Sequence, residues 1–156
     1  MEKYFKPHVI RAGGIAGVIG AAFSLITLIP AFGGIIACLF WPVALLVYLG
    51  AGVLAVYWGK AEGAEQTIQQ GAIDGALAGA IAGVIAGVVS WIVNILRELL
   101  FGVIFRSGLE NQALAFIATV VGGFVGIFFA IILAAILGAI GGLIYAAIQQ
   151  SQKKPA

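Results

Sequence analysis

Long apolar stretches make up most of the hydrophobic pattern of this chain. Four of them contain no Lys, Arg, Asp or Glu, and each is long enough to cross a hydrocarbon core of about 30 Å as a helix of roughly 20 residues. They predict membrane-spanning helices at residues 12–29, 34–58, 75–96 and 121–145. Backbone groups in lipid need internal hydrogen bonds, and the alternation typical of a membrane β-strand is missing from these stretches. We therefore expect an all-α, polytopic membrane protein, with a four-helix bundle that forms one domain over residues 1–156.

Composition supports the same class. The chain is 63% hydrophobic and 9% charged, whereas a soluble domain carries about 25% charged residues. This excludes a soluble globular fold, and the high hydrophobicity excludes a disordered chain. The net charge of +2 comes without a basic run, so nucleic acid is not an expected partner. The expected partner is the lipid bilayer, together with the protein itself or other membrane proteins.

The basic residues predict an orientation. Six of the eight lie on one side of the membrane if both termini and the loop 59–74 share that side: Lys3, Lys6, Arg11, Lys60, Lys153 and Lys154. The other side keeps Arg97 and Arg106. Cytoplasmic loops carry an excess of Lys and Arg. We expect a multi-pass protein of the plasma membrane with its N-terminus and C-terminus in the cytoplasm.

The fourth apolar stretch, residues 113–148, is longer than one crossing requires, because it would extend about 54 Å as a helix. Either this helix projects into water or its first turns lie in the membrane interface. The preceding residues 98–112 predict a short interfacial segment rather than a fifth span, since a brief apolar run lies there between Arg97, Glu98 and Arg106.

Glycines at four-residue spacing are the most specific feature of the sequence. In lipid, helices associate mainly through small residues that let their backbones approach closely. Glycine otherwise costs about 0.5–1 kcal/mol in a helix interior, so a regular row indicates contact, as in a glycine zipper. The glycines predicted to pack helices are Gly71, Gly75, Gly79, Gly83 and Gly87 in the third span, Gly13, Gly17 and Gly20 in the first, and Gly122, Gly126, Gly138 and Gly142 in the fourth.

The row in the third span also predicts a central position for that helix. Each four-residue step turns about 40° around a helix, so one straight parallel neighbour cannot follow the whole row. We expect two neighbours, and a larger cost for bulky residues at Gly79 or Gly83 than at Val84 or Val88. Three interpretations stay open: the row packs helices of the same chain, it joins copies of the chain or a larger membrane complex, or it lines a pore.

The two halves of the chain resemble each other. Residues 15–19 recur as residues 81–85, and Ser24 matches Ser90 at the same offset. A weaker match relates the second and fourth spans and includes Tyr57 and Tyr145. These matches reflect either a duplicated helical hairpin, as in transporters with parallel repeats, or the shared Gly, Ala, Ile and Val composition.

Polar residues near the span ends are the remaining candidates for chemistry. Asp74 is either a cation or proton site near the membrane surface or an acid that the helix dipole stabilises. Asn94 and Arg97 form a polar patch at the far end of the third span, either functional or held by local hydrogen bonds and snorkelling. His8 is interpreted as a surface residue, with metal or pigment ligation as the alternative.

No catalytic residues, metal ligands or cofactor are predicted. The chain lacks a zinc signature, a nucleophile elbow and a phosphate-binding loop. Cys38 is the single cysteine and is interpreted as an apolar space-filler. The protein is therefore not expected to be an enzyme.

A family resemblance rests on residues 52–83. The run Leu-Ala-Val-Tyr that ends at Tyr57, followed by a short polar loop and the glycine-rich residues 71–83, resembles small prokaryotic four-span, glycine-rich membrane proteins of unassigned function. The resemblance implies a four-span plan and no activity. A four-span glycine-rich plan is also similar to the mitochondrial inner-membrane translocase family, but that family's Arg-x3-Asp element is missing here.

Two functional hypotheses follow. The first is a non-enzymatic protein that acts through helix–helix packing, as a homo-oligomer or as an accessory or assembly subunit of a larger membrane complex. The alternative is a small channel or transporter for an ion or small solute, which would require polar groups buried within the membrane.

Overall fold

Four long helices and one short helical segment make up the described structure. The computed structural model describes residues 6–26, 33–63, 67–102 and 109–152, without the side chains of residues 33–41, 102 and 109–112. The elements are α1 (Pro7–Ile26), α2 (Gly33–Ala61), α3 (Ile68–Arg97), the π-helical segment η2 (Glu98–Gly102) and α5 (Leu109–Gln152). The described residues contain no strand. Each long helix has the length and apolar composition needed to cross a membrane, so the prediction of an all-α, four-helix membrane bundle is confirmed.

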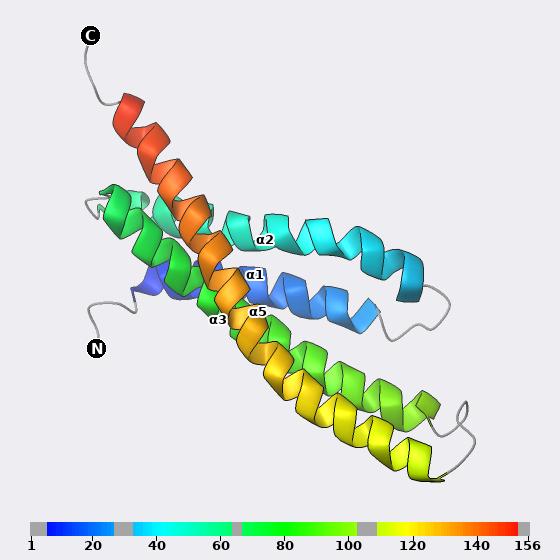
Figure 1. Cartoon of the computed structure of the whole chain (residues 1–156). Helices are drawn as coiled ribbons and strands as arrows, with labels where there is room; N and C mark the ends of the chain where they lie inside the picture. The colour runs from blue at the N-terminus through cyan, green and yellow to red at the C-terminus, as the bar shows by residue number, and fades with distance from the viewer. Residues whose placement is uncertain (1–5, 27–32, 64–66, 103–108, 153–156) are drawn as a thin grey trace.

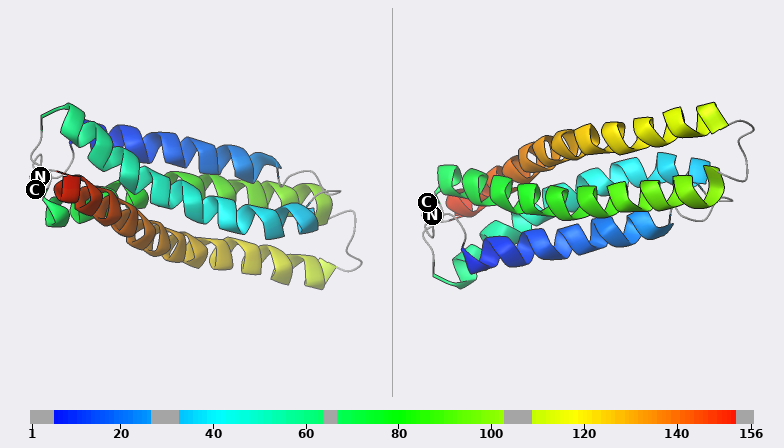
Figure 2. Two further views of the ribbon diagram at one scale, coloured as in Figure 1. Left: turned by 90° about the horizontal axis from the view of Figure 1, so that it is seen from above. Right: turned by 90° about the horizontal axis from the view of Figure 1, so that it is seen from below.

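The helices run up and down in an elongated bundle, with both ends of the chain at the same end (Figures 1 and 2). We call this the proximal end; α1 and α3 begin there, and α2 and α5 finish there. The other end is called distal. Figure 1 shows α5 running diagonally across α3 and extending beyond it toward the C-terminus. Its 44 residues correspond to about 66 Å, so α5 is much longer than one hydrocarbon crossing.

Helix α3 lies at the centre of the bundle. It contacts α5 most extensively, and it also contacts α1 and α2. The sequence predicted two neighbours for this helix, and the structure gives three. Helix α5 contacts α2 as well as α3, so the two hairpins meet through both members of each pair.

Alanine fills most of the interior. Buried alanines of α1, α2 and α3 face one another in two adjoining groups: Ala12, Ala55 and Ala78 in one, and Ala16, Ala51 and Ala82 in the other. Such small side chains bring helix axes close together, which is how membrane helices gain contact without a hydrophobic driving force. Val9, Val56 and Asp74 are the largest side chains that are fully buried. The Asp74 carboxylate and the buried His8 ring therefore lie within an interior that is otherwise made of small apolar side chains.

The helices extend beyond the predicted spans at the proximal end. Helix α1 begins at Pro7, and α3 begins at Ile68 behind a polar turn. The expected interfacial segment 98–112 is partly a continuation of α3, because η2 follows Arg97 directly. Residues 27–29 of the first predicted span and residues 103–108, with Arg106, lie outside the described residues, as do Lys3, Lys153 and Lys154. A helix continues beyond the hydrocarbon core for as long as its backbone hydrogen bonds form. The apolar pattern of the sequence therefore does not show where the helix ends.

Candidate functional site

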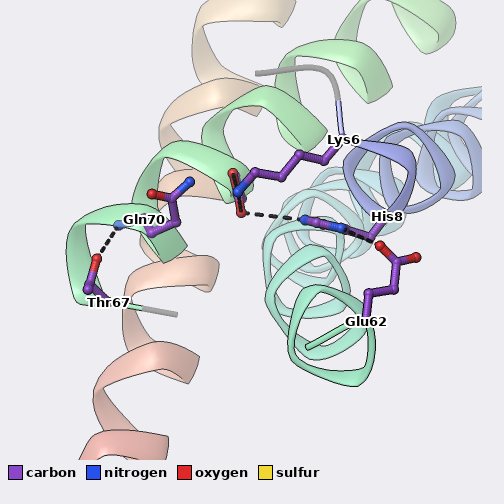
Figure 3. A network of polar contacts seen from close by, with 6 residues as sticks. Lys6, His8, Glu62, Thr67 and Gln70 are labelled. Carbon is purple, nitrogen blue, oxygen red and sulfur yellow. Dashed lines mark hydrogen bonds and ion pairs between the residues drawn. The ribbon is translucent and has the colours of Figure 1, made fainter. Parts of the chain in front are cut away.

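Four charged or ionisable side chains meet at the proximal end of the bundle. Lys6 and His8 come from the start of α1, Glu62 follows α2, and Asp74 lies in the second turn of α3. We call these four residues the proximal polar cluster (Figure 3). The Lys6 Nζ atom lies 3.1 Å from Asp74 Oδ2 and 3.4 Å from Asp74 Oδ1. The His8 Nδ1 atom lies 2.8 Å from Glu62 Oε2. The cluster thus joins three helices that are far apart in sequence.

Burial is unequal within the cluster. Only 1% of the Asp74 side chain and 2% of the His8 side chain are exposed, whereas the exposed fractions are 25% for Lys6 and 40% for Glu62. An unpaired carboxylate buried at this depth would be very costly. The ion pair with Lys6 compensates for this cost, and the partial exposure of Lys6 keeps that amine hydrated.

The His8 ring lies between the two carboxylates (Figure 3). Its Nε2 atom is 3.5 Å from Asp74 Oδ2 and has no hydrogen-bond partner among the described residues. A doubly protonated ring carries a donor toward each carboxylate. With that ring, the cluster holds two positive and two negative charges, and with a neutral ring it carries one net negative charge. No group of three His, Cys, Asp or Glu side chains that could hold a metal ion occurs in the described part of the chain.

Local sequence signals position these side chains. Pro7 opens α1, a position where its missing N–H costs nothing, and places His8 in the first turn. Thr67 caps α3: its Oγ1 atom accepts a hydrogen bond of 3.1 Å from the backbone N–H of Gln70 (Figure 3). This cap fixes the start of α3, so that Asp74 lies on the helix face that meets α1.

The structure corrects the interpretation of His8 and adds to that of Asp74. His8 is not a surface residue, because it is buried against Asp74 and Glu62. Asp74 does more than complement a helix dipole, since it is almost fully buried and paired. One signal in the sequence places them at the same level: His8 precedes Ile15 by the same seven residues as Asp74 precedes Ile81, ahead of the matched segments 15–19 and 81–85.

The glycines of α3 face α5 over most of the row. A Cβ atom added at Gly75 would meet the Gly138 carbonyl oxygen, and one added at Gly79 would meet the Ala134 carbonyl oxygen. At Gly83 the nearest atom would be Ala134 Cβ, 3.0 Å away. The remaining two glycines mark the ends of this contact: Gly71 lies against Gly142 and Ala146, and Gly87 lies 3.6 Å from Ile127. One crossing helix therefore follows the row, which differs from the expected division between two neighbours.

The other predicted glycines fall into two groups. Gly13, Gly17 and Gly20 of α1 face α3, and Gly138 and Gly142 of α5 face the α3 backbone. A Cβ atom added at Gly122 or Gly126 would meet no neighbouring atom of the described residues within 4 Å. The role of this last pair in helix packing stays a prediction.

Three further contacts were not predicted. A Cβ atom at Gly52 of α2 would meet the Gly138 carbonyl, and one at Gly141 of α5 would meet the Leu49 carbonyl. Gly123 lies against the Trp91 ring. None belongs to a long four-residue row, so the spacing that identified the glycines of α3 gives no signal for them.

The distal polar patch does not form a site of its own. Asn94 is exposed, and its Nδ2 donates a hydrogen bond of 2.9 Å to the Ser90 carbonyl, one turn back on the same helix. Arg97 is exposed at the end of α3. The structure does not bring either residue to the proximal polar cluster, which lies at the opposite end.

One family model matches nearly the whole chain. The MJ1491 transmembrane domain family covers residues 5–151, which include all four helices almost completely. The chain belongs to this family. The predicted membership of a membrane-protein family is thereby confirmed, and the family description supports an integral, multi-pass membrane protein. No curated protein and no solved structure matches the chain.

Proposed function

We propose that this MJ1491-family protein is a non-enzymatic membrane subunit that works through helix–helix packing, either with further copies of itself or within a larger membrane complex. The protein would lie in the plasma membrane with its proximal end and both termini in the cytoplasm, because the proximal end carries the larger share of Lys and Arg. The proposal assigns α5 as the helix that receives the partner.

The observation behind this proposal is the exposure of α5. In its most apolar segment 6% of the residues are buried, against 28–33% in the other three helices. One side of α5 contacts α3 and α2, and large apolar side chains such as Phe128 and Phe129 cover the rest. Gly122 of this helix is exposed and has no neighbour within 4 Å in the described residues. Small residues on an exposed helix face promote close helix association in lipid.

Native mass spectrometry from mild detergent tests the proposal. We expect the wild-type protein to be released as an oligomer or with a stoichiometric membrane partner, and Gly122→Leu to shift it to monomer while its thermal stability stays unchanged. Gly14→Leu is the matched control, because Gly14 also has no neighbour within 4 Å among the described residues. A wild-type protein that remains a lone monomer in lipid nanodiscs would refute the assembly role.

A small channel or transporter is the second candidate, favoured by the burial of Asp74 and His8. Ionisable residues buried in membrane proteins often lie on ion or proton pathways. Proteoliposomes with the wild-type protein would then show ion flux that Asp74→Asn abolishes. Flux that is the same in both proteins, or the same as in empty vesicles, would refute this candidate.

A further inference from the structure

A pocket of about 290 Å³ lies among all four long helices in the distal half of the bundle. Its polar lining residues are Ser24 of α1, Tyr48 of α2, and Ser90, Trp91 and Asn94 of α3. Apolar residues complete the wall: Ala86 and Gly87 of α3, and Gly123, Gly126, Ile127 and Ala130 of α5. Figure 1 shows the α1–α2 hairpin and the α3–α5 pair diverging toward the distal end, where this pocket lies.

Several polar atoms of this pocket lack protein partners. Within the part of the chain that the structure describes, neither the Tyr48 hydroxyl nor the Ser90 hydroxyl has a hydrogen-bond partner. Asn94 donates through its amide nitrogen to a backbone carbonyl, which leaves its carbonyl oxygen as an acceptor. In hydrocarbon, each unsatisfied polar group costs several kcal/mol. A lipid tail in this pocket would leave all three unsatisfied, whereas water or a hydrogen-bonding molecule would satisfy them.

The pocket is closed toward the proximal end and has an uncharged lining. Gly87 and Ala130 line the pocket. One helical turn nearer the proximal end, Gly83 packs so closely on Ala134 that a Cβ atom added at Gly83 would lie 3.0 Å from the Ala134 Cβ. The buried group of Ala16, Ala51 and Ala82 lies at the same level. No lining residue carries a formal charge, so a charged ligand would lose its hydration without a counter-charge.

We propose that this pocket is a water-filled binding site for a small uncharged molecule that both donates and accepts hydrogen bonds, such as a polyol. Tyr48 and Ser90 would supply hydroxyl contacts, and the Asn94 carbonyl would accept. The volume is just below the range for ligand pockets, which is about 300–1,000 Å³, and therefore limits the ligand to about ten water-sized groups. The two serines come from matched positions of the two halves, Ser24 and Ser90. The proposal does not depend on assembly, because one chain supplies every lining residue.

Cysteine labelling in lipid nanodiscs tests whether the pocket holds water. On a Cys38→Ala background, Ser90→Cys is treated with a small water-soluble methanethiosulfonate, and Val84→Cys is the control because Val84 is 43% exposed on the apolar surface of the same helix. We expect Ser90→Cys to react at least about tenfold faster, since the reactive thiolate forms only in contact with water or a polar site. Equal rates would overturn the proposal.

Protection by a probe molecule tests the ligand class. Glycerol should slow the labelling of Ser90→Cys about threefold when present at twice its Kd, while labelling of Ser151→Cys at the proximal end stays unchanged. Adding Tyr48→Phe should weaken this protection, which is measured as the ratio of the labelling rates with and without glycerol within the same variant. Labelling of Ser90→Cys that glycerol does not slow would overturn the binding site, and equal protection in the Tyr48→Phe background would overturn the role of Tyr48.

Discussion

The two halves of the bundle differ although they are built from the same four helices and similar residues. In the proximal half, Gly138 and Gly142 of α5 lie directly against the α3 backbone. In the distal half, Gly122 and Gly126 have the same spacing and no neighbour in the described residues, and a pocket lies beside Gly126. Spacing alone therefore does not produce helix contact. The crossing of α5 over α3 decides which of two equivalent glycine pairs is used.

Charge separates the halves in the same way. The proximal half contains a buried carboxylate with two cationic or ionisable neighbours, and the distal pocket is lined by uncharged polar groups. Close contact between helices excludes water, so polar groups in the proximal half must satisfy one another. In the distal half the helices leave space, and polar groups can be satisfied by what enters it.

The largest effect is expected from a bulky residue at one of the closest helix contacts, that of Gly79 with α5. Gly79→Leu places a side chain where the Ala134 carbonyl of α5 lies, so the two helices must separate. We expect a loss of about 3 kcal/mol, the upper end of overpacking costs, measured by reversible unfolding in SDS–detergent mixtures. Gly122→Leu should change stability by much less, and equal losses for both variants would contradict the contrast between the halves.

The second effect concerns the buried charge. Asp74→Asn removes the negative partner of Lys6 and leaves the His8 Nε2 atom beside a neutral amide. We expect a loss of about 2 kcal/mol, within the range for a buried group that loses a charged partner, by the same unfolding measurement. A double-mutant cycle with Lys6→Met isolates the ion pair. Additive losses in that cycle would show that Lys6 and Asp74 do not interact.

The sequence predicts the helices and one glycine row of this bundle, but not the proximal polar cluster. The four helices follow from apolar stretches without charge, because lipid leaves few alternatives for the backbone. The contacts of Gly75 and Gly79 follow from their row, whereas those of Gly52 and Gly141 depend on how α2 crosses α5. The proximal polar cluster required His8 and Asp74 to face each other across two helices. The rotation of each helix about its own axis sets that geometry. Because small residues occur on several faces of α1 and α3, the periodicity of the sequence does not show which face meets the neighbouring helix.

The third prediction concerns a hydrogen bond that joins α3 to α5 in the distal half. The Trp91 Nε1 atom donates a hydrogen bond of 3.1 Å to the Val120 carbonyl of α5, and the ring lies against Gly123. Trp91→Phe keeps an aromatic ring and removes the donor, so we expect a loss of about 1 kcal/mol. The same change should speed water-soluble labelling of Ser90→Cys, because the wall of the pocket loosens. Unchanged stability together with unchanged labelling would mean that this bond does not hold the distal helices together.

The smallest expected effect comes from Glu62, the more exposed of the two carboxylates that flank His8. Glu62→Gln removes a charge that is 40% exposed and 2.8 Å from the His8 Nδ1 atom, while its amide oxygen can still accept from the ring. Water solvates the Glu62 side of this contact, so we expect a loss of about 0.5 kcal/mol, the low end for a single hydrogen bond. Asp74→Asn is the matched change on the buried side of the same imidazole. A loss in Glu62→Gln as large as that in Asp74→Asn would show that His8, rather than the buried position of Asp74, determines the stability of the cluster.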